Sequence, residues 1–207
     1  MRTLIGGYTA TLPPERQHLV RQFRLTRVAR KVVGVGSVGT QAWIMLMETG
    51  DGRGSLLLQA KEAQRSVLAA YAGQSQYDHH GERVVVGQRL MQAASDIFLG
   101  WQTITGAGEA RTDYYVRQLR DWKYSAPIEQ FDPVVMAGYA ELCGWTLARA
   151  HARTGDRIAI AAYLGGSTRF EEAVTDFAVT YADQSIRDHA ALADAVADGR
   201  VQARMGV

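Results

Sequence analysis

The sequence has little cysteine, lysine or proline, and it has no long apolar run. Cys143 is the single cysteine of the 207 residues, so the chain cannot form an internal disulfide, a composition typical of a reducing compartment. Nowhere do about 18 apolar residues follow one another, and the first residues have no apolar core of a signal peptide. We therefore expect a cytoplasmic protein without a membrane-spanning segment.

The sequence also lacks a strong charge of either sign. Its 23 basic and 21 acidic residues leave a net charge of +2, and both kinds are spread along the chain. Nucleic-acid-binding proteins concentrate basic residues on one surface, so this pattern gives no reason to expect a nucleic-acid partner. A chain of this length can bury one large core or two smaller ones.

The pattern of the chain changes near residue 125, from mostly strand-like to helical. We expect an N-terminal helical or irregular segment at 1–25, a sheet lobe at 26–124 and a helical subdomain at 125–207. A short helix is expected from Pro14 to about Phe23, after two prolines. The sheet lobe is predicted to contain strands at 27–33, 40–48, 55–62, 97–104 and 112–120, and a helix at 81–95. The predicted fold class is therefore α+β, with about five antiparallel strands and one helix before the helical subdomain.

Two long helices are expected in the second half. Asp132 and Pro133 are typical of an N-cap and a first helical residue, and the helix that follows should end near Gly155. Thr168 and Glu171 have the spacing of a capping box for the second helix. Apolar residues at helical spacing predict a buried stripe on each helix; they are Val135, Tyr139, Leu142, Cys143, Thr146 and Ala150 on the first, and Phe170, Val174, Phe177 and Tyr181 on the second.

A G-x-G-x-x-G run at 34–39 is the most informative motif. A dinucleotide-binding fingerprint needs a helix after the glycines, but here a predicted strand follows them. A glycine-rich hairpin between two strands is how protein-kinase-like folds cover the phosphates of ATP. Gly34, Gly36 and Gly39 would approach the phosphates, and Ser37 could donate to a phosphate oxygen. The alternative is an ordinary hairpin whose glycines supply positive φ angles.

Kinase-like folds hold the phosphates with a lysine on the third strand, which a carboxylate on the next helix orients. Lys61 lies on the third predicted strand, and Glu82 lies in the first turn of the predicted helix. As alternatives, Lys61 could extend to solvent from a strand end, and Glu82 could simply favour a helix N-terminus. The combination and its order favour a kinase-like lobe, in which Leu119 to Asp121, before Trp122 and Lys123, would form the hinge at an adenine pocket.

Other groups of polar residues are weaker indications of a functional site. Asp78, His79 and His80 lack further ligands at suitable spacing, so we expect a solvated loop there and no metal. Asp156 follows a His-Ala-Arg-Thr-Gly run that imitates a kinase catalytic loop, but Ala161 stands where the metal-binding asparagine would be. We interpret Asp156 as a turn or helix-end residue, and Cys143 as an ordinary buried cysteine. The Asp-Phe-Ala triplet at 176–178 falls inside the second long helix.

In the glycine run and in four further segments, the chain resembles a bacterial domain-of-unknown-function family, numbered twenty-two fifty-two. The runs that carry the resemblance lie at 30–40, 81–85, 87–96, 115–121 and 147–153, and the similarity extends over nearly the whole chain from about Leu12. The family is grouped with protein-kinase-like and aminoglycoside-phosphotransferase-like folds. The resemblance thus implies ATP with magnesium as the cofactor.

The resemblance also implies that catalytic parts are missing. Relatives are about twice as long, and their Gly-Asp-x-His-x-x-Asn loop and Asp-Phe-Asp motif precede the glycine loop. The chain is therefore expected to be the C-terminal half of such a protein, without catalytic residues of its own, and at most part of an ATP-dependent phosphotransferase. The alternative is a non-catalytic assembly module that forms a homo-oligomer or pairs with a separately encoded N-terminal half.

Overall fold

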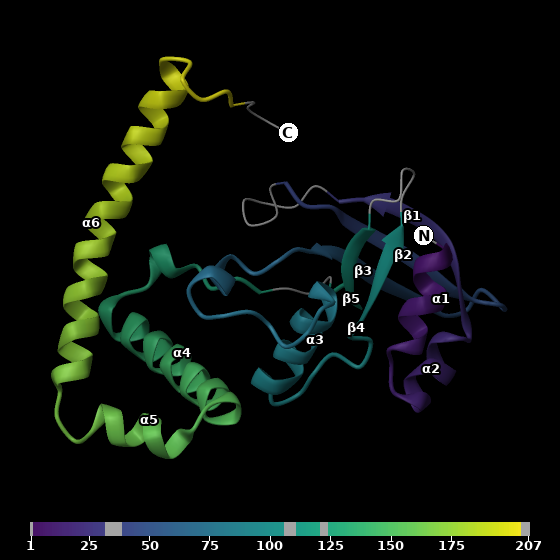
Figure 1. The fold of residues 1–207 in the computed structure, drawn as a ribbon, viewed down its shortest axis with the longest axis horizontal. Helices are drawn as coiled ribbons and strands as arrows, with labels where there is room; N and C mark the ends of the chain where they lie inside the picture. The colour runs from purple at the N-terminus through teal and green to yellow at the C-terminus, as the bar shows by residue number, and fades with distance from the viewer. Residues whose placement is uncertain (1, 32–38, 106–110, 121–123, 204–207) are drawn as a thin grey trace. The chain divides into compact units, whose positions relative to one another are not determined.

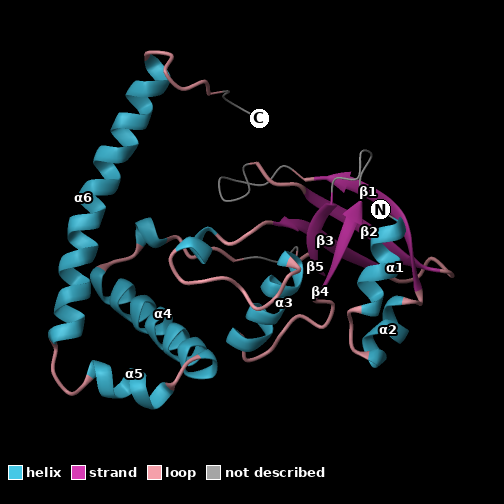
Figure 2. Cartoon of the chain, viewed as in Figure 1, coloured by secondary structure: helices cyan, strands magenta, loops and turns pink. Residues whose placement is uncertain are grey.

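The computed structural model describes residues 2–31, 39–105, 111–120 and 124–203 of the chain. It confirms the α+β fold class: a five-stranded antiparallel sheet is followed by helices (Figures 1 and 2). The helices are α1 (Arg2–Ala10), α2 (Pro14–Val20), α3 (His80–Met91), α4 (Pro133–Thr154), α5 (Arg157–Leu164) and α6 (Arg169–Ala197). The strands are β1 (Phe23–Arg30), β2 (Ala42–Thr49), β3 (Ser55–Ala63), β4 (Gly100–Thr105) and β5 (Arg111–Gln118).

The sheet has the strand order β1-β2-β3-β5-β4, and every neighbouring pair is antiparallel. All five predicted strands and the helix between the third and fourth strands are therefore confirmed. Strand β1 begins and ends earlier than expected, and a register shift between Leu25 and Arg27 interrupts its pairing with β2. β1 and β4 form the two edges of the sheet, and most of β1 is exposed.

The main core lies between one face of the sheet and helices α1 and α2. Alternate strand residues point to opposite faces, so Met45 of β2 and Leu58 and Ala60 of β3 share the core face. Tyr8, Leu12 and Val20 from the two helices pack against this face. Figure 1 shows α1 and α2 on one side of the sheet and α3 on the other.

Helix α1 lies in the segment expected to be helical or irregular, and it forms although its sequence contains adjacent glycines. The helix packs on β4, where a side chain at Gly100 would collide with Thr11 and Tyr8. The Thr11 hydroxyl accepts a hydrogen bond from the Trp101 amide at 3.1 Å. Small residues therefore permit a close helix-to-strand approach that overrides the low helix propensity of glycine.

The start of α4 agrees with the sequence, since Oδ1 of Asp132 accepts hydrogen bonds from the amides of Val134 and Val135, each at 2.9 Å. The end of α4 at Thr154 also agrees. At α6 the Thr168 hydroxyl donates to Glu172 at 2.7 Å, so the expected capping box with Glu171 does not form.

The expected buried stripes of α4 and α6 are wrong for the described chain. No residue of α4 is buried, and Ala195 is the buried residue of α6. Cys143 is likewise exposed rather than buried. The apolar spacing is present on both helices, but most of these residues remain exposed. Among the described residues, no helix combines the length and the apolarity needed to cross a bilayer.

The chain divides into two compact units, Met1–Thr154 and Gly155–Val207. The first contains the sheet with helices α1 to α4, and the second contains α5 and α6. In the second unit, the rings of Tyr163 and Phe170 meet edge to face, with centroids 6.3 Å apart. The division at 1–25, 26–124 and 125–207 that the sequence pattern indicates stays a prediction.

Candidate functional site

Lys61 lies on the sheet face opposite the main core. It is half-buried near the end of β3, and its register partners are Ala42 on β2 and Tyr115 on β5. Gln59, two residues earlier, shares this face because side chains alternate along a strand. Helix α3 packs on the same face, since the Arg89 guanidinium lies 5.9 Å from the centroid of the Trp101 ring on β4. The expected order of a third-strand lysine under a following helix is therefore present.

The chain that follows the glycine run is tied to β3 beside Lys61. The Gln41 amide donates to Oε2 of Glu62 at 3.0 Å, and the Glu62 amide donates to the Gln41 carbonyl at 2.8 Å. On the other side of the connection, the Lys31 amide donates to the Ala42 carbonyl at 2.8 Å. Both ends of the glycine-rich connection thus lie at the end of the sheet that carries Lys61.

An apolar patch adjoins Lys61 on the same face. Ile44 and Leu46 of β2 and Leu57 of β3 are half-buried, and the register pairs Ile44 with Gln59 and Leu46 with Leu57. Opposite Gln59 on β5 stands Arg117, whose guanidinium donates to the Gln59 side-chain oxygen at 3.3 Å. This face therefore combines half-buried apolar side chains with the cationic groups of Lys61 and Arg117.

Of the predicted loop residues, Gly34, Gly36 and Ser37 lie outside the described residues. Gly39 is described: it has a φ angle of +80° and is exposed, with open space where a Cβ would stand. A positive φ agrees with a turn that requires glycine at this point. In the expected hinge, Leu119 donates its amide to the Leu57 carbonyl at 2.9 Å, whereas Asp121, Trp122 and Lys123 are not described.

Glu82 is half-buried in the first turn of α3, and this helix contacts β3. Arg89 follows seven residues later and therefore occupies nearly the same side of the helix. Since Arg89 lies over Trp101, that side is nearer to β4 than to β3. The ion pair between Lys61 and Glu82 stays a prediction.

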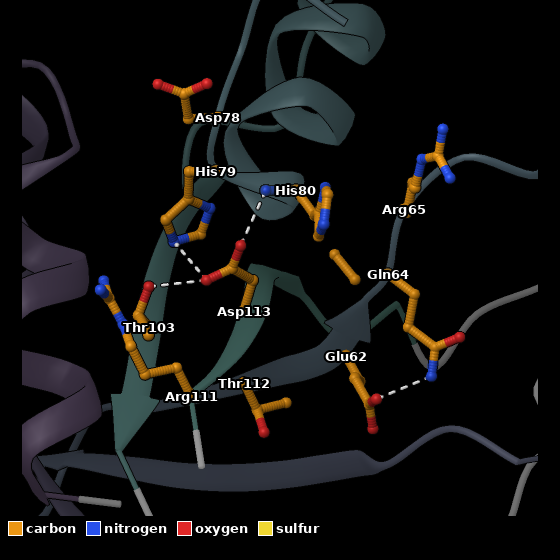
Figure 3. A pocket seen from close by; sticks show the side chains of 11 residues that line it. Glu62, Gln64, Arg65, Asp78, His79, His80, Thr103, Arg111, Thr112 and Asp113 are labelled. Carbon is orange, nitrogen blue, oxygen red and sulfur yellow. Dashed lines mark hydrogen bonds and ion pairs between the residues drawn. The ribbon is translucent and has the colours of Figure 1, made fainter. Parts of the chain in front are cut away.

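A polar hollow of about 560 Å³ lies at the N-terminus of α3, where β3 ends and β5 begins. Figure 3 shows Asp113 of β5 at its centre, between His79, His80 and Thr103. The Thr103 hydroxyl donates to Oδ1 of Asp113 at 2.7 Å, and the His80 amide donates to Oδ2 at 2.8 Å. Arg65 and Arg111 stand on opposite sides of the hollow.

His79 closes the first turn of α3. Its Nδ1 accepts a hydrogen bond from the Glu82 amide at 3.1 Å, so the proton of the neutral imidazole is carried by Nε2. Nε2 is buried and lies 3.4 Å from Oδ1 of Asp113, a separation suited to an ion pair when the ring is protonated but outside hydrogen-bond geometry. Nδ1 of His79 therefore faces the first turn of α3, and Nε2 faces the Asp113 carboxylate.

Asp113 is held in its charged form. Burial alone would raise the pKa of its carboxyl, but hydrogen bonds from Thr103 and from the His80 amide, with the two nearby imidazoles, outweigh burial and lower that pKa. Asp113 and His79 together satisfy two of the amides that a helix N-terminus leaves open. The solvated loop expected at 78–80 is found only in part: Asp78 is exposed outside the helix, whereas His79 and His80 are half-buried and anchor α3 to the sheet.

Asp156, in the run that imitates a kinase catalytic loop, acts as a helix cap. Oδ1 of Asp156 accepts from the amides of Ile158 and Ala159 at 2.9 and 3.0 Å, which confirms the helix-end interpretation of this residue. Across the described part of the chain, no three His, Cys, Asp or Glu side chains are placed to hold a metal ion. The sequence reasoning missed the role of His79, because histidine is an uncommon N-cap and Asp113 is remote in sequence.

The family comparison adds one finding. Residues 1–195 match the family described as "Uncharacterized protein conserved in bacteria (DUF2252)". The chain belongs to this family. The DUF2252 match spans the whole first compact unit and most of the second. No curated protein and no solved structure matches the chain.

Proposed function

We propose that the sheet lobe is the phosphate-binding half of an ATP site in a kinase-like protein. The fold order supports this: a glycine-rich connection joins β1 to β2, Lys61 lies on β3, and α3 follows before β4 and β5. Kinase-like lobes use the same order to cover the phosphates and to hold them with a lysine. In this proposal Gly34, Gly36, Ser37 and Gly39 approach the phosphates.

The observation that carries the proposal is the link between Gln41 and Glu62. These two hydrogen bonds hold the end of the glycine-rich connection beside Lys61. In this proposal the amides of the connection and the Lys61 ammonium converge on that end of the sheet. Such a convergence suits the oxygens of a polyphosphate, because amides and ammonium both favour bound negative charge. The neighbouring surface of Ile44, Leu46 and Leu57 suits the apolar face of an adenine.

We infer that this chain does not transfer a phosphoryl group by itself. Phosphoryl transfer needs a base and carboxylates that hold magnesium, and the nearest imitation, Asp156, uses its carboxylate to cap α5. Magnesium would enter with ATP and neutralise charge on the phosphates. A role with ATP places the protein in the cytoplasm, in agreement with its single cysteine.

The test is a thermal shift of the full chain with a non-hydrolysable ATP analogue and magnesium. We expect a higher melting temperature, since a ligand that binds the native state stabilises it. Lys61→Ala should abolish the shift, whereas Arg53→Ala, in the turn at the opposite end of β2 and β3, should retain it. Glu82→Gln should reduce the shift if Glu82 orients Lys61. No shift at roughly millimolar nucleotide would overturn the proposal.

A second candidate function is an assembly module. The many exposed apolar residues of α4 and of α6 favour it, because large exposed apolar surfaces mark sites of protein–protein association. Either a second copy or a separately encoded N-terminal half would cover them. Sedimentation equilibrium of the purified chain tests the first case, and a strict monomer would contradict it.

A further inference from the structure

Helix α6 carries an exposed aromatic pair on an acidic background. The rings of Phe177 and Tyr181 stack with centroids 5.6 Å apart and an angle of 14° between their planes. They are 65% and 60% exposed, so most of this apolar surface faces solvent. Asp188 lies seven residues after Tyr181 and therefore on nearly the same side of the helix. We call Phe177, Tyr181 and Asp188 the α6 face.

The charge of α6 restricts the surfaces that could cover this face. Six acidic residues and two basic residues lie between Arg169 and Ala197, so the helix is strongly negative. A covering surface should therefore be apolar in its centre, to receive the aromatic rings, and positive at its border.

The first compact unit of the same chain has a surface with both properties. A hollow of about 420 Å³ lies between the end of α3 and the second half of α4, and most of its lining is apolar. Met91, Ala93 and Trp145 contribute to its floor, and the lining includes Arg149 and Arg153 but no acidic residue. We call this the α3–α4 hollow.

The two arginines of the hollow are held in place. The Arg149 guanidinium lies over the Trp145 ring, 4.5 Å from its centroid, and Arg153 donates a hydrogen bond to the Met91 carbonyl at 3.2 Å. Arginines that are already positioned lose less conformational entropy when they bind a carboxylate. The hollow therefore resembles a prepared site for an apolar group that is flanked by an acid.

We propose that the α3–α4 hollow receives the α6 face of a second copy of this chain. Phe177 and Tyr181 enter the hollow, and Asp188 pairs with Arg149 at its border. If both copies exchange α6 in this way, the contact has the two-fold symmetry of most homodimers. The inference rests on the second candidate function, which it makes specific, and it does not depend on nucleotide binding.

The contact is at the small end of specific interfaces. Fully burying an aromatic side chain removes about 150–250 Å² from water. Phe177 and Tyr181 are 65% and 60% exposed, so the four rings of a reciprocal contact remove roughly 400–600 Å², and the hollows that receive them a similar area. Stable interfaces bury roughly 1,200–2,000 Å² in total, so we expect a dimer that dissociates on dilution.

Sedimentation equilibrium of the full chain over a range of concentrations tests the inference. We expect a dimer, and Phe177→Asp should raise its dissociation constant by at least about tenfold. Asp188→Arg and Arg149→Asp should each weaken the dimer, and combining them should restore it. Asp183→Arg, an exposed acid on another side of α6, is the matched control and should leave the dimer unchanged.

The outcomes separate the inference from the function on which it rests. A wild-type monomer at all concentrations would overturn both the dimer and the self-association function. A dimer that withstands Phe177→Asp, or charge changes that the double variant does not rescue, would overturn this interface while self-association stands. Circular dichroism checks that each variant keeps its helices, and the two exposed charge changes keep the test decisive if Phe177→Asp unfolds.

Discussion

The hydroxyl of Tyr8 donates a 2.6 Å hydrogen bond to the backbone carbonyl of Phe98, ninety residues further along the chain. Tyr8 is fully buried, and burial raises the pKa of its phenol far above the ordinary value, so the group stays neutral. This bond joins α1 to the segment that enters β4. The N-terminal helix is therefore tied to the sheet by a buried hydrogen bond.

Replacing Tyr8 with phenylalanine should destabilise the fold. The variant retains the ring but leaves the buried Phe98 carbonyl without its partner, a change that costs about 1–3 kcal/mol in the free energy of unfolding. Urea denaturation of the full chain measures this change. Tyr71→Phe is the control, because Tyr71 is exposed and its hydroxyl faces water; equal effects of the two substitutions would contradict the role of the buried bond.

Alanine substitutions at two glycines of α3 should change the stability of the fold in opposite directions. A Cβ at Gly81 would collide with the Tyr114 carbonyl, so Gly81→Ala should cost about 1–3 kcal/mol through overpacking. Gly87 has open space at the same position, and Gly87→Ala should stabilise the helix by roughly 0.5–1 kcal/mol. Denaturant midpoints of the two variants provide the measurement. A Gly81→Ala protein as stable as the wild type would mean that α3 does not pack closely on β5.

The stability of the anchored α3 terminus should depend on pH. The pKa of Asp113 is lower in the folded chain than in the unfolded chain, so its contribution is complete above the ordinary carboxyl value. It is lost as the pH falls through the lowered folded value. Asp113→Asn should remove this component, so the difference in unfolding free energy between wild type and variant should shrink in acid. A difference that is constant from neutral pH to acid would contradict the assignment.

The single thiol should be accessible in the native chain. Cys143 is exposed on α4, so a maleimide should label the folded protein about as fast as the denatured protein. Mass spectrometry of timed samples follows the reaction, and Cys143→Ser is the control for non-specific labelling. Strong protection of the native thiol would contradict the exposure of α4 in solution.

The sheet was predictable because its signals are local. Apolar alternation, turn residues and the glycines at 34–39 predict five strands and their order along the chain, and the structure confirms these elements. Asp132 and Asp156 were likewise recognisable, because a cap acts within three residues of itself.

The missed features depend on residues that are distant in sequence. Asp113 anchors the amide of His80, which lies 33 positions earlier, and no local pattern near either residue indicates that contact. The stripes on α4 and α6 illustrate a different limit: amphipathic spacing shows that a helix face favours burial, but it does not identify the surface that buries it.

The position of β1 at the edge of the sheet has a consequence for how copies of the chain meet. Exposed arginines recur along this strand at Arg24, Arg27 and Arg30. Like charges on an edge repel a second edge strand, so they protect unpaired backbone groups from continuing the sheet into another molecule. The β1 edge is thereby closed to strand addition, so the contact that we propose between copies uses the helices and leaves this edge free.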